Sequence, residues 1–419
     1  MLHKPRSLSP EEEANELHHQ PVARGVAWAL ILFFLLVIAV RPMLLLRNAD
    51  VRGTFTLFFR DVGKAFGEGH GPRAINRGLR AAIGEFDQDI EKNSRFSDRL
   101  RPVWQRTMAA LGTGHETVHV GKDGWLEYRP AFDYVVGPPI FGEARLRKWK
   151  DADPRPALLR LAADLRRRGI ALWVLAAPNK VMIHPESFAP ELRGAAEGLD
   201  NPSFEQLRGE LEAAGIRVFD PRPGLRALAR DRPVYFKTDS HWNPQGIDVT
   251  AAGLAAALEA ELPLGPRNRD WLGKAQTLDY SGDLARMLHV HKSPKFPFEP
   301  VELRLVTDAR GRIWKPEQGA EVLLLGDSFA NIFAPRGAGL PAQLAYHLGR
   351  AVDRIAIDGG GPIGTRQQLD RELRQDPERL QGTKVVVLEF AARELVIGRW
   401  PVIPLPKPAG GPSKPAGGP

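Results

Sequence analysis

From residue 156 onward the chain repeats one pattern, in which an amphipathic helical stretch ends at a glycine and a short apolar run follows. PALLRLAADLRRRG ends at Gly169 and precedes IALWVLAAP, while SFEQLRGELEAAG, with Ser203 at its N-cap, ends at Gly215 and precedes IRVFD. Because glycine commonly ends helices and short apolar runs are typical of buried strands, this pattern predicts βαβ units. A chain of such units forms a parallel sheet covered by helices.

The same alternation continues toward the C-terminus. The predicted strands are EVLLLG, DRIAID and KVVVLEF, and the predicted helices are LPAQLAYHLG and TRQQLDRELRQ. In the last helix, Thr365 and Gln368 have the spacing of a capping box. The sequence therefore predicts an α/β fold with an open, doubly wound parallel sheet. In such sheets ligands bind at the carboxyl ends of the strands, so the loops after the strands are the places to search for a site.

An apolar segment precedes this domain. The run GVAWALILFFLLVIAV has no charged residue, and PMLLL extends it to Leu46 after Arg41. A helix of this first run is about 24 Å long against a hydrocarbon core of ~30 Å, and Arg41 can extend its charge to the interface. We predict a transmembrane signal anchor over residues 25–46; a buried core helix is the alternative. The Lys and Arg residues on its two sides do not decide its orientation.

The remaining boundaries follow from composition. Residues 1–24 form a polar N-terminal tail, and residues 47–117 are predicted to be a helical membrane-proximal stalk. The segment VHVGKDGWLEYRP has alternating residues around a Lys-Asp-Gly turn, which predicts a hairpin at the start of the globular domain, residues 118–400. Residues 401–419 are rich in Pro and Gly, as in a flexible tail.

The composition limits the possible chemistry. The chain has no cysteine, which excludes disulfides, a thiolate nucleophile and Cys-ligated zinc. Its net charge of +8 is spread along the chain without a nucleic-acid-binding motif, so we predict a solvated basic surface and no nucleic-acid partner. His289 and His291 lack a clear third ligand, and neither a metal nor a cofactor is predicted.

The stretch FKTDSHWNPQG has the features of half a catalytic site. Asn243 is a good N-cap and Pro244 suits the first helical position, so His241 lies just before a helix start. In an extended segment the side chains of Asp239 and His241 point the same way. The carboxylate then accepts a hydrogen bond from one imidazole nitrogen and leaves the other nitrogen free to act as a base.

Two other loops that follow strands complete the set of candidates. In LLLGDSFAN an apolar strand ends at Gly326, and Ser328 follows at the turn where a nucleophile would stand; the alternative is that Ser328 or Asp327 only caps the next helix. In IDGGGPIGTR, Gly360 and Gly361 are candidates for an oxyanion hole, although a plain turn explains them equally well.

Taken together, TDSHW, GDSFAN, YSGDLARML, GWLEYRP and VVVLEFAARELVIGRW resemble the alginate O-acetyltransferase family, SGNH-hydrolase-like proteins of the AlgJ and AlgX type. The similarity extends over roughly residues 86–400. It includes a permuted motif order, because the Asp-x-His pair precedes the serine.

The resemblance implies an SGNH-like fold in which Ser328 takes an acetyl group, His241 is its general base and Asp239 orients His241. It also implies a single-pass protein of the inner membrane with its catalytic domain in the periplasm. A membrane-bound O-acyltransferase partner would then supply acetyl groups for a polysaccharide acceptor.

Three further residues are weaker candidates. Lys180 and Arg336 follow a strand and the serine turn, and either would suit an acidic sugar, with a surface charge as the alternative; Trp242 is a substrate-binding candidate beside His241. The predicted function is O-acetylation of an exopolysaccharide through a Ser-His-Asp triad. The rivals are a carbohydrate acetyl esterase with the same triad and a polysaccharide-binding scaffold of the acetylation machinery.

Overall fold

The computed structural model describes residues 49–67, 78, 117–192, 199–291 and 294–408. The predicted anchor at residues 25–46 lies outside these ranges, as do the polar tail and most of the predicted stalk. Within them no helix is both long and apolar enough to span a membrane. The chain divides into two compact units, up to Val103 and from Trp104 on. Helix α3 (Ala49–Gly67) belongs to the first unit.

The second unit is built on a five-stranded parallel sheet, which confirms the prediction from the helix-glycine-strand pattern. Its strand order is β4-β3-β9-β7-β8. The strands are β3 (Ala171–Ala177), β4 (Arg217–Val218), β7 (Val322–Gly326), β8 (Asp353–Ala356) and β9 (Val385–Ala391). All five point the same way, so the predicted loops after them share one edge of the sheet.

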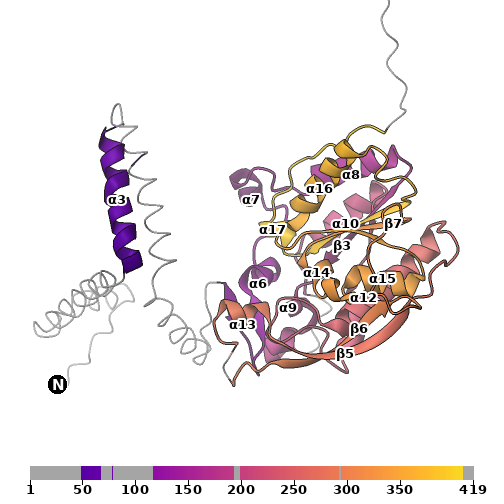
Figure 1. The fold of residues 1–419 in the computed structure, drawn as a ribbon, viewed down its shortest axis with the longest axis horizontal. Helices are drawn as coiled ribbons and strands as arrows, with labels where there is room; N and C mark the ends of the chain where they lie inside the picture. Colours follow the sequence, from indigo (N-terminus) through magenta and orange to yellow (C-terminus); the bar gives the residue numbers. More distant parts are fainter. Residues whose placement is uncertain (1–48, 68–77, 79–116, 193–198, 292–293, 409–419) are drawn as a thin grey trace, which may run out of the picture. The chain divides into compact units, whose positions relative to one another are not determined.

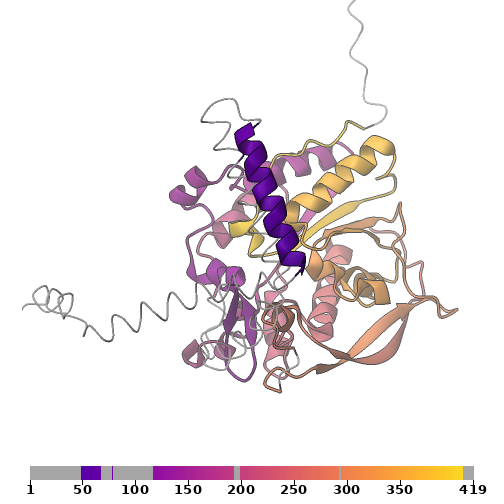
Figure 2. The same cartoon turned by 60° about the vertical axis from the view of Figure 1, so that its left-hand side comes forward.

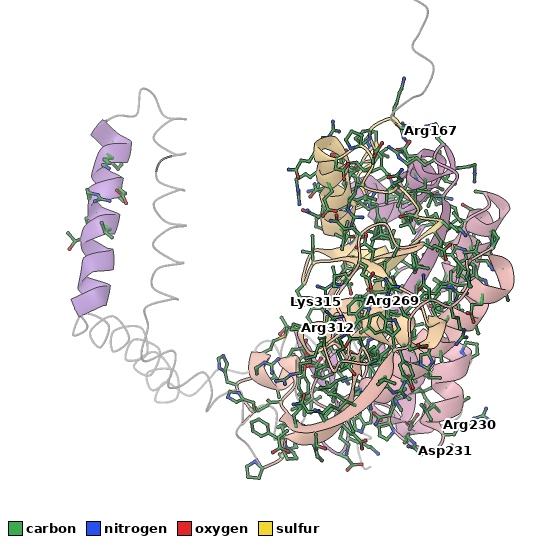
Figure 3. All side chains as sticks on the ribbon, turned by 45° about the vertical axis from the view of Figure 1, so that its right-hand side comes forward. Arg167, Arg230, Asp231, Arg269, Arg312 and Lys315 are labelled. Carbon is green, nitrogen blue, oxygen red and sulfur yellow. The ribbon has the colours of Figure 1, made fainter. Side chains whose placement is uncertain are left out.

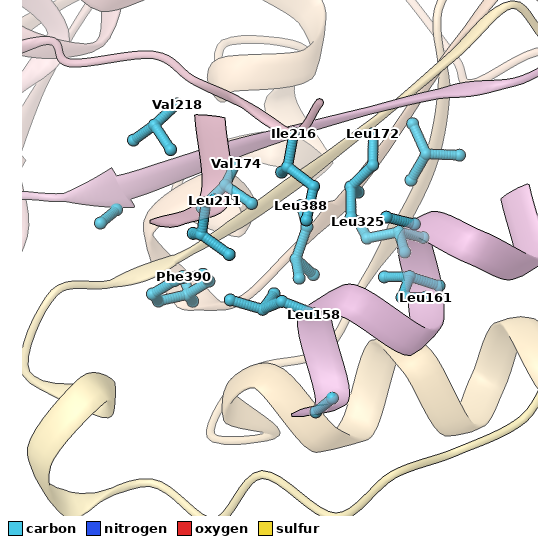
Figure 4. Packing of buried hydrophobic residues seen from close by; sticks show 14 of the residues in the cluster. Leu158, Leu161, Leu172, Val174, Leu211, Ile216, Val218, Leu325, Leu388 and Phe390 are labelled. Atoms are coloured by element: carbon cyan, nitrogen blue, oxygen red, sulfur yellow. The ribbon is translucent and has the colours of Figure 1, made fainter. Parts of the chain in front are cut away.

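Helices cover both faces of this sheet (Figure 1). One face carries α8 (Arg155–Arg166), α10 (Phe204–Ala213) and α16 (Gly361–Gln375), and the other carries α12 (Pro244–Glu261) and α15 (Leu340–Leu348). Strand β3 shows why both faces need cover. Leu172 and Val174 pack in the first core, seen in Figure 4, while Trp173 and Leu175 pack in the second, because successive side chains of a strand alternate between its faces.

Two antiparallel ribbons stand outside the sheet. The predicted hairpin is confirmed as β1 (Val118–Val120) and β2 (Leu126–Tyr128), with Asp123 and Gly124 at positive φ in its turn. The second ribbon, β5 (Leu272–Tyr280) with β6 (Glu299–Thr307), was not predicted. It runs along the lower edge of the domain beside α12 and α15 (Figures 1 and 2).

Shorter helices connect these elements. They are α6 (Arg129–Val136), α7 (Glu143–Lys148), α9 (Lys180–Ile183), α11 (Arg222–Ala229), α13 (Asp283–Met287), α14 (Ser328–Asn331) and α17 (Glu394–Ile397). Charged side chains such as Arg167, Arg230 and Arg269 project from separate parts of the surface (Figure 3). The basic residues are therefore dispersed over this unit, as the sequence indicates.

The helix ends agree with the sequence at Gly169 and Gly215, which have the positive φ of a left-handed helix end. The capping box at Thr365 and Gln368 is wrong, because α16 begins four residues earlier, at Gly361. Pro362 fits the first turn of a helix, where its missing N–H is not needed. Thr365 is consequently buried inside the helix, and within the described part of the chain its hydroxyl has no hydrogen-bond partner.

A buried guanidinium joins α7 to α17. Arg145 donates from Nε to Val396 O (2.8 Å), from Nη1 to Ile140 O (2.8 Å) and Ala152 O (3.0 Å), and from Nη2 to Leu395 O (2.9 Å). It therefore holds the connection after α6 against the chain that follows β9, at the carboxyl edge of the sheet.

We predict that Arg145→Met lowers the free energy of unfolding by roughly 3 kcal/mol, because it leaves buried carbonyl groups without donors. Arg147→Met is the matched control, since Arg147 lies on the same helix and makes only an exposed ion pair with Glu143. That change costs under about 1 kcal/mol. Urea denaturation followed by circular dichroism measures both values, and equal losses would contradict the structural role of Arg145.

Candidate active site

The loop of His241 is fixed by the helix that follows it. Asn243 is the N-cap of α12, its side-chain oxygen accepts from the N–H of Gly246 at 3.0 Å, and Pro244 stands in the first turn, as predicted. The indole N–H of Trp242 donates to the carbonyl of Phe329 at 2.9 Å. Trp242 follows His241 and Phe329 follows Ser328, so this hydrogen bond fixes the two loops relative to each other.

Ser328 is the first residue of α14, directly beyond the end of β7. Asp327, and not Ser328, is the N-cap: its Oδ1 accepts from the N–H of Phe329 at 2.8 Å and its Oδ2 from the N–H of Ala391 at 2.9 Å. The hydroxyl of Ser328 is therefore free of capping. A side chain at Gly326 would lie 2.4 Å from the Cβ of Ala330, so the turn requires glycine there.

Three side chains form a hydrogen-bonded series at this edge of the sheet. His241 Nδ1 lies 2.6 Å from Asp239 Oδ1, and His241 Nε2 lies 2.8 Å from Ser328 Oγ. Because the Asp239 carboxylate only accepts, Nδ1 carries the proton and Nε2 accepts from the serine hydroxyl. Asp239 is fully buried, and the side chain of His241 is 12% exposed. The geometry brings all three predicted residues together.

The charges of the series reinforce this tautomer. Burial disfavours the imidazolium, but the charge and hydrogen bond of Asp239 and the charge of Asp283 outweigh it, so the pKa of His241 is raised. Burial would raise the pKa of Asp239, but its interactions with His241 and its hydrogen bonds from Tyr280 and Asp283 hold that pKa well below its usual range. Asp239 is thus an anion at neutral pH.

The segment YSGDL contains residues of the site whose role the sequence did not reveal. Tyr280 Oη donates to Asp239 Oδ2 at 2.7 Å, and the N–H of Asp283 donates to the same oxygen at 2.8 Å. Ser240 Oγ donates to Asp283 Oδ2 at 2.6 Å. The only signal was that this motif recurs in the family resemblance, because the segment is separated from Asp239 by about forty residues.

Arg393 is a further charged residue near the serine, again not predicted. Its guanidinium lies 5.5 Å from the ring centroid of Phe329 and 5.2 Å from that of Tyr128. Its buried Nε has no hydrogen-bond partner among the described residues. The available signal was its place in FAARE, directly after the apolar run of β9 and so at the same edge of the sheet.

Three of the five oxyanion and substrate-binding candidates do not fit their predicted roles. Lys180 is fully buried, and its ammonium donates to the carbonyls of Leu126 and Lys237, so it is neither a surface charge nor a sugar ligand. Trp242 is fully buried with its N–H used within the protein. Gly360 donates its N–H to Ile357 O at 3.1 Å, which removes it as an oxyanion donor.

For Gly361 and Arg336 the predicted roles stay predictions. Gly361 starts α16 at positive φ, with Glu394 beside its Cα. Arg336 is exposed after α14, with Nη1 at 3.5 Å from Gln276 Oε1 of β5. Neither is hydrogen bonded to the Asp239-His241-Ser328 series in the described part of the chain.

Asp239, His241 and Asp283 also place one ligand atom each within 4.8 Å of one another, a spacing that suits a metal ion. The lone pairs of this group are already directed at donors, however. Both Asp239 oxygens accept from N–H and O–H groups, and Nδ1 of His241 bears the proton of that contact. The donor set fits a hydrogen-bonded network and not a cation.

The part of the chain that contains this site is similar to known proteins. The family described as SGNH hydrolase-like domain, acetyltransferase AlgX, matches residues 118–392. A probable alginate O-acetylase AlgJ of Pseudomonas syringae pv. tomato is 28% identical over 292 residues, which are 67% of this chain and 70% of that protein. The corresponding protein of Pseudomonas aeruginosa is 27% identical over 299 residues, 67% of this chain and 71% of its own.

A solved structure also shares the fold. The O-acetyltransferase domain of Pseudomonas putida AlgJ superposes with a TM-score of 0.52 at 22% identity, covering 67% of this chain and 92% of that domain. The family match over residues 118–392 includes the parallel sheet and the loops at its carboxyl edge. The chain therefore belongs to the family of SGNH hydrolase-like domains of the acetyltransferase AlgX type.

Proposed function

We propose that this protein is a membrane-anchored O-acetyltransferase that adds acetyl groups to hydroxyls of a polysaccharide, with Ser328 as its nucleophile. The observation that carries the proposal is the contact of 2.8 Å between Ser328 Oγ and His241 Nε2, in a chain of an acetyltransferase family. A serine hydroxyl is a weak nucleophile at neutral pH and needs such a base.

In the first half-reaction, Ser328 Oγ attacks the carbonyl carbon of the acetyl donor while its proton passes to His241 Nε2. The resulting tetrahedral oxyanion collapses, the bond to the donor oxygen breaks, and His241 returns the proton to that leaving group. Asp239 holds the imidazole in place and stabilises the imidazolium, as in other Ser-His-Asp arrangements. The product is an acetyl ester on Ser328.

In the second half-reaction, His241 Nε2 takes the proton of an acceptor hydroxyl, whose oxygen attacks the acetyl carbon. Collapse of the second oxyanion releases Ser328, which regains its proton from His241, and leaves the acetyl group on the sugar. Water in the same position would give hydrolysis. Transfer therefore requires that the acceptor is held in place more effectively than water.

The oxyanion needs donors, and the backbone supplies one. The N–H of Ser328 has no acceptor among the described residues, because Asp327 caps α14 through the N–H of Phe329 instead. Arg393, stacked on Phe329, places a positive charge near the same region. A free N–H beside a cation favours the developing negative charge.

The proposal includes a location, which rests on the apolar run and on the family resemblance. Residues 25–46 would anchor the chain in the inner membrane, with the catalytic domain in the periplasm and a membrane-bound O-acyltransferase supplying acetyl groups. The apolar run supports the anchor, and the family resemblance of the sequence supports the periplasmic location and the partner.

The covalent step is tested by intact-protein mass spectrometry after incubation with an activated acetyl ester. We expect the mass of one acetyl group on the wild-type protein, or rapid ester turnover, and the loss of both in Ser328→Ala. Ser240→Ala is a control for the choice of serine, because Ser240 lies near His241 Nδ1 and not near Nε2. Equal labelling of wild type and Ser328→Ala would refute the role of Ser328.

The pH dependence tests His241 as the base. Only the neutral imidazole accepts the serine proton, so kcat/KM for ester hydrolysis should fall as the pH drops through the pKa of His241, which lies above the usual ~6.5. Since the charge of Asp283 contributes to that raised pKa, Asp283→Asn should move the acidic limb to lower pH. Asp279→Asn, an exposed neighbour of Tyr280, should leave it unmoved. If the acidic limb of the kcat/KM profile stays at the same pH in Asp283→Asn, His241 is excluded as the titrating group.

A further inference from the structure

A polar hollow lies between the β5–β6 ribbon and the helices α12 and α15. Its volume is about 370 Å³, and it is separate from the Asp239-His241-Ser328 series. Its polar lining comes from both helices and from one face of the ribbon, through Gln245, Asp248, Glu302, Arg304, Gln343 and Tyr346. None of these residues takes part in the proposed chemistry.

Hydrogen bonds hold part of this lining rigid. Arg304 donates to Asp248 through Nη1 (2.7 Å) and Nη2 (2.9 Å), and Gln343 Nε2 donates to the carbonyl of Arg304 at 2.8 Å. The guanidinium lies 4.8 Å from the ring centroid of Tyr346. Gly273 makes room for this arrangement, because a Cβ there would meet the Arg304 side chain at 3.0 Å. The hollow is thus formed before any ligand arrives.

Other polar groups of the lining remain available. The amide of Gln245, the carboxylate of Glu302 and the hydroxyl of Tyr346 have no hydrogen-bond partner in the part of the chain that the structure describes. Together with the exposed apolar side chain of Ala275, they offer donors and acceptors beside a small apolar surface. Such a mixture suits a pyranose ring, which has hydroxyls at its rim and C–H groups on its faces.

The charges of the lining disfavour an acidic ligand. Its only cation is Arg304, which is already paired with Asp248, while Glu302 has no counter-ion in the described part of the chain. A carboxylate entering the hollow would therefore meet Glu302 without an unpaired cation to offset the repulsion. The lining favours a neutral sugar.

The ribbon and α12 connect this hollow to the candidate active site. Strand β5 runs from Gly273 and Ala275 in the hollow to Tyr280, whose side chain lies on the other face of the strand and donates to Asp239. The five steps along the strand from Ala275 to Tyr280 span about 17 Å. Gln245 is also only four positions from His241 along the chain. An acceptor several sugar units long would reach both places.

We propose that this hollow is an acceptor subsite, which binds a neutral pyranose unit of the polysaccharide while another unit presents its hydroxyl to Ser328. The inference rests on the proposed function, and it adds the class of sugar and the place where the chain is held. A subsite at this distance makes acetyl transfer depend on acceptor length, because a disaccharide fills one place and not both.

The test compares acetyl transfer from an activated acetyl ester to cellohexaose, cellobiose and a β-linked mannuronate hexamer, using the full chain in detergent. We expect the wild type to acetylate cellohexaose at least tenfold faster than either other acceptor. Ala275→Trp fills the hollow and should lower transfer to cellohexaose at least tenfold relative to hydrolysis of the same ester. Lys274→Trp is the matched control on the opposite face of β5, and it should stay within twofold of the wild type.

A change of specificity tests the charge argument. Glu302→Lys should shift the ratio of mannuronate to cellohexaose transfer at least fivefold toward mannuronate. Preference of the wild type for mannuronate, an unchanged ratio in Glu302→Lys, or equal effects of the two tryptophan variants would overturn the proposal.

Failure of the proposed function has a separate signature. Saturation-transfer NMR with cellohexaose and Ser328→Ala protein measures binding without any chemistry, and Ala275→Trp in that background should abolish the signal. Binding that disappears in this way, together with a wild type that forms no acetyl-serine, would leave the subsite in place and refute the transferase. Absence of binding in an enzyme that forms acetyl-serine would refute the subsite alone.

Discussion

A buried carboxylate is the interaction on which the site depends. Asp239 is fully enclosed yet remains charged, because four donors surround it: the Nδ1–H and the backbone N–H of His241, the hydroxyl of Tyr280 and the N–H of Asp283. Burying a charged group without such donors has a prohibitive cost in free energy, because the group loses its hydration. The donors come from the loop before α12, the end of β5 and the start of α13, so these three segments must assemble together before His241 can be oriented.

The serine side of the site depends on a second buried acid. The backbone N–H of Asp327 donates to Glu389 Oε2 at 3.1 Å, in the neighbouring strand β9. Burial and the charge of Asp327 raise the pKa of Glu389 well above its ordinary value. The turn that carries Ser328 is thereby bonded to the sheet and meets His241 at a fixed distance.

The sequence predicted what is encoded locally. A glycine after an amphipathic stretch ends a helix, and this pattern predicted the sheet. Asp239 lies two residues before His241, and the Asn-Pro cap follows, so the relative orientation of the two side chains could also be predicted. Contacts between segments that are distant in the sequence leave no comparable local pattern, so they could not be predicted. Tyr280 reaches Asp239 only because β5 folds back across the domain, and Lys180 was taken as exposed because a buried ammonium is rare unless carbonyl groups surround it. Burial of this kind is decided by tertiary contacts.

The proposed transfer also needs an explanation of why water does not take the acetyl group. The side chain of His241 retains 12% of its exposure and Ser328 is only half-buried, so the site does not exclude water by enclosure. Selection for the sugar must then come from binding at a distance. A rigid polar hollow along β5 would hold the polymer and raise the effective concentration of its hydroxyls at the acetyl-serine, whereas water gains nothing from such contacts. In this arrangement the ribbon would have two roles: Tyr280 at the end of β5 holds Asp239, and the hollow along the strand would decide between the sugar and water.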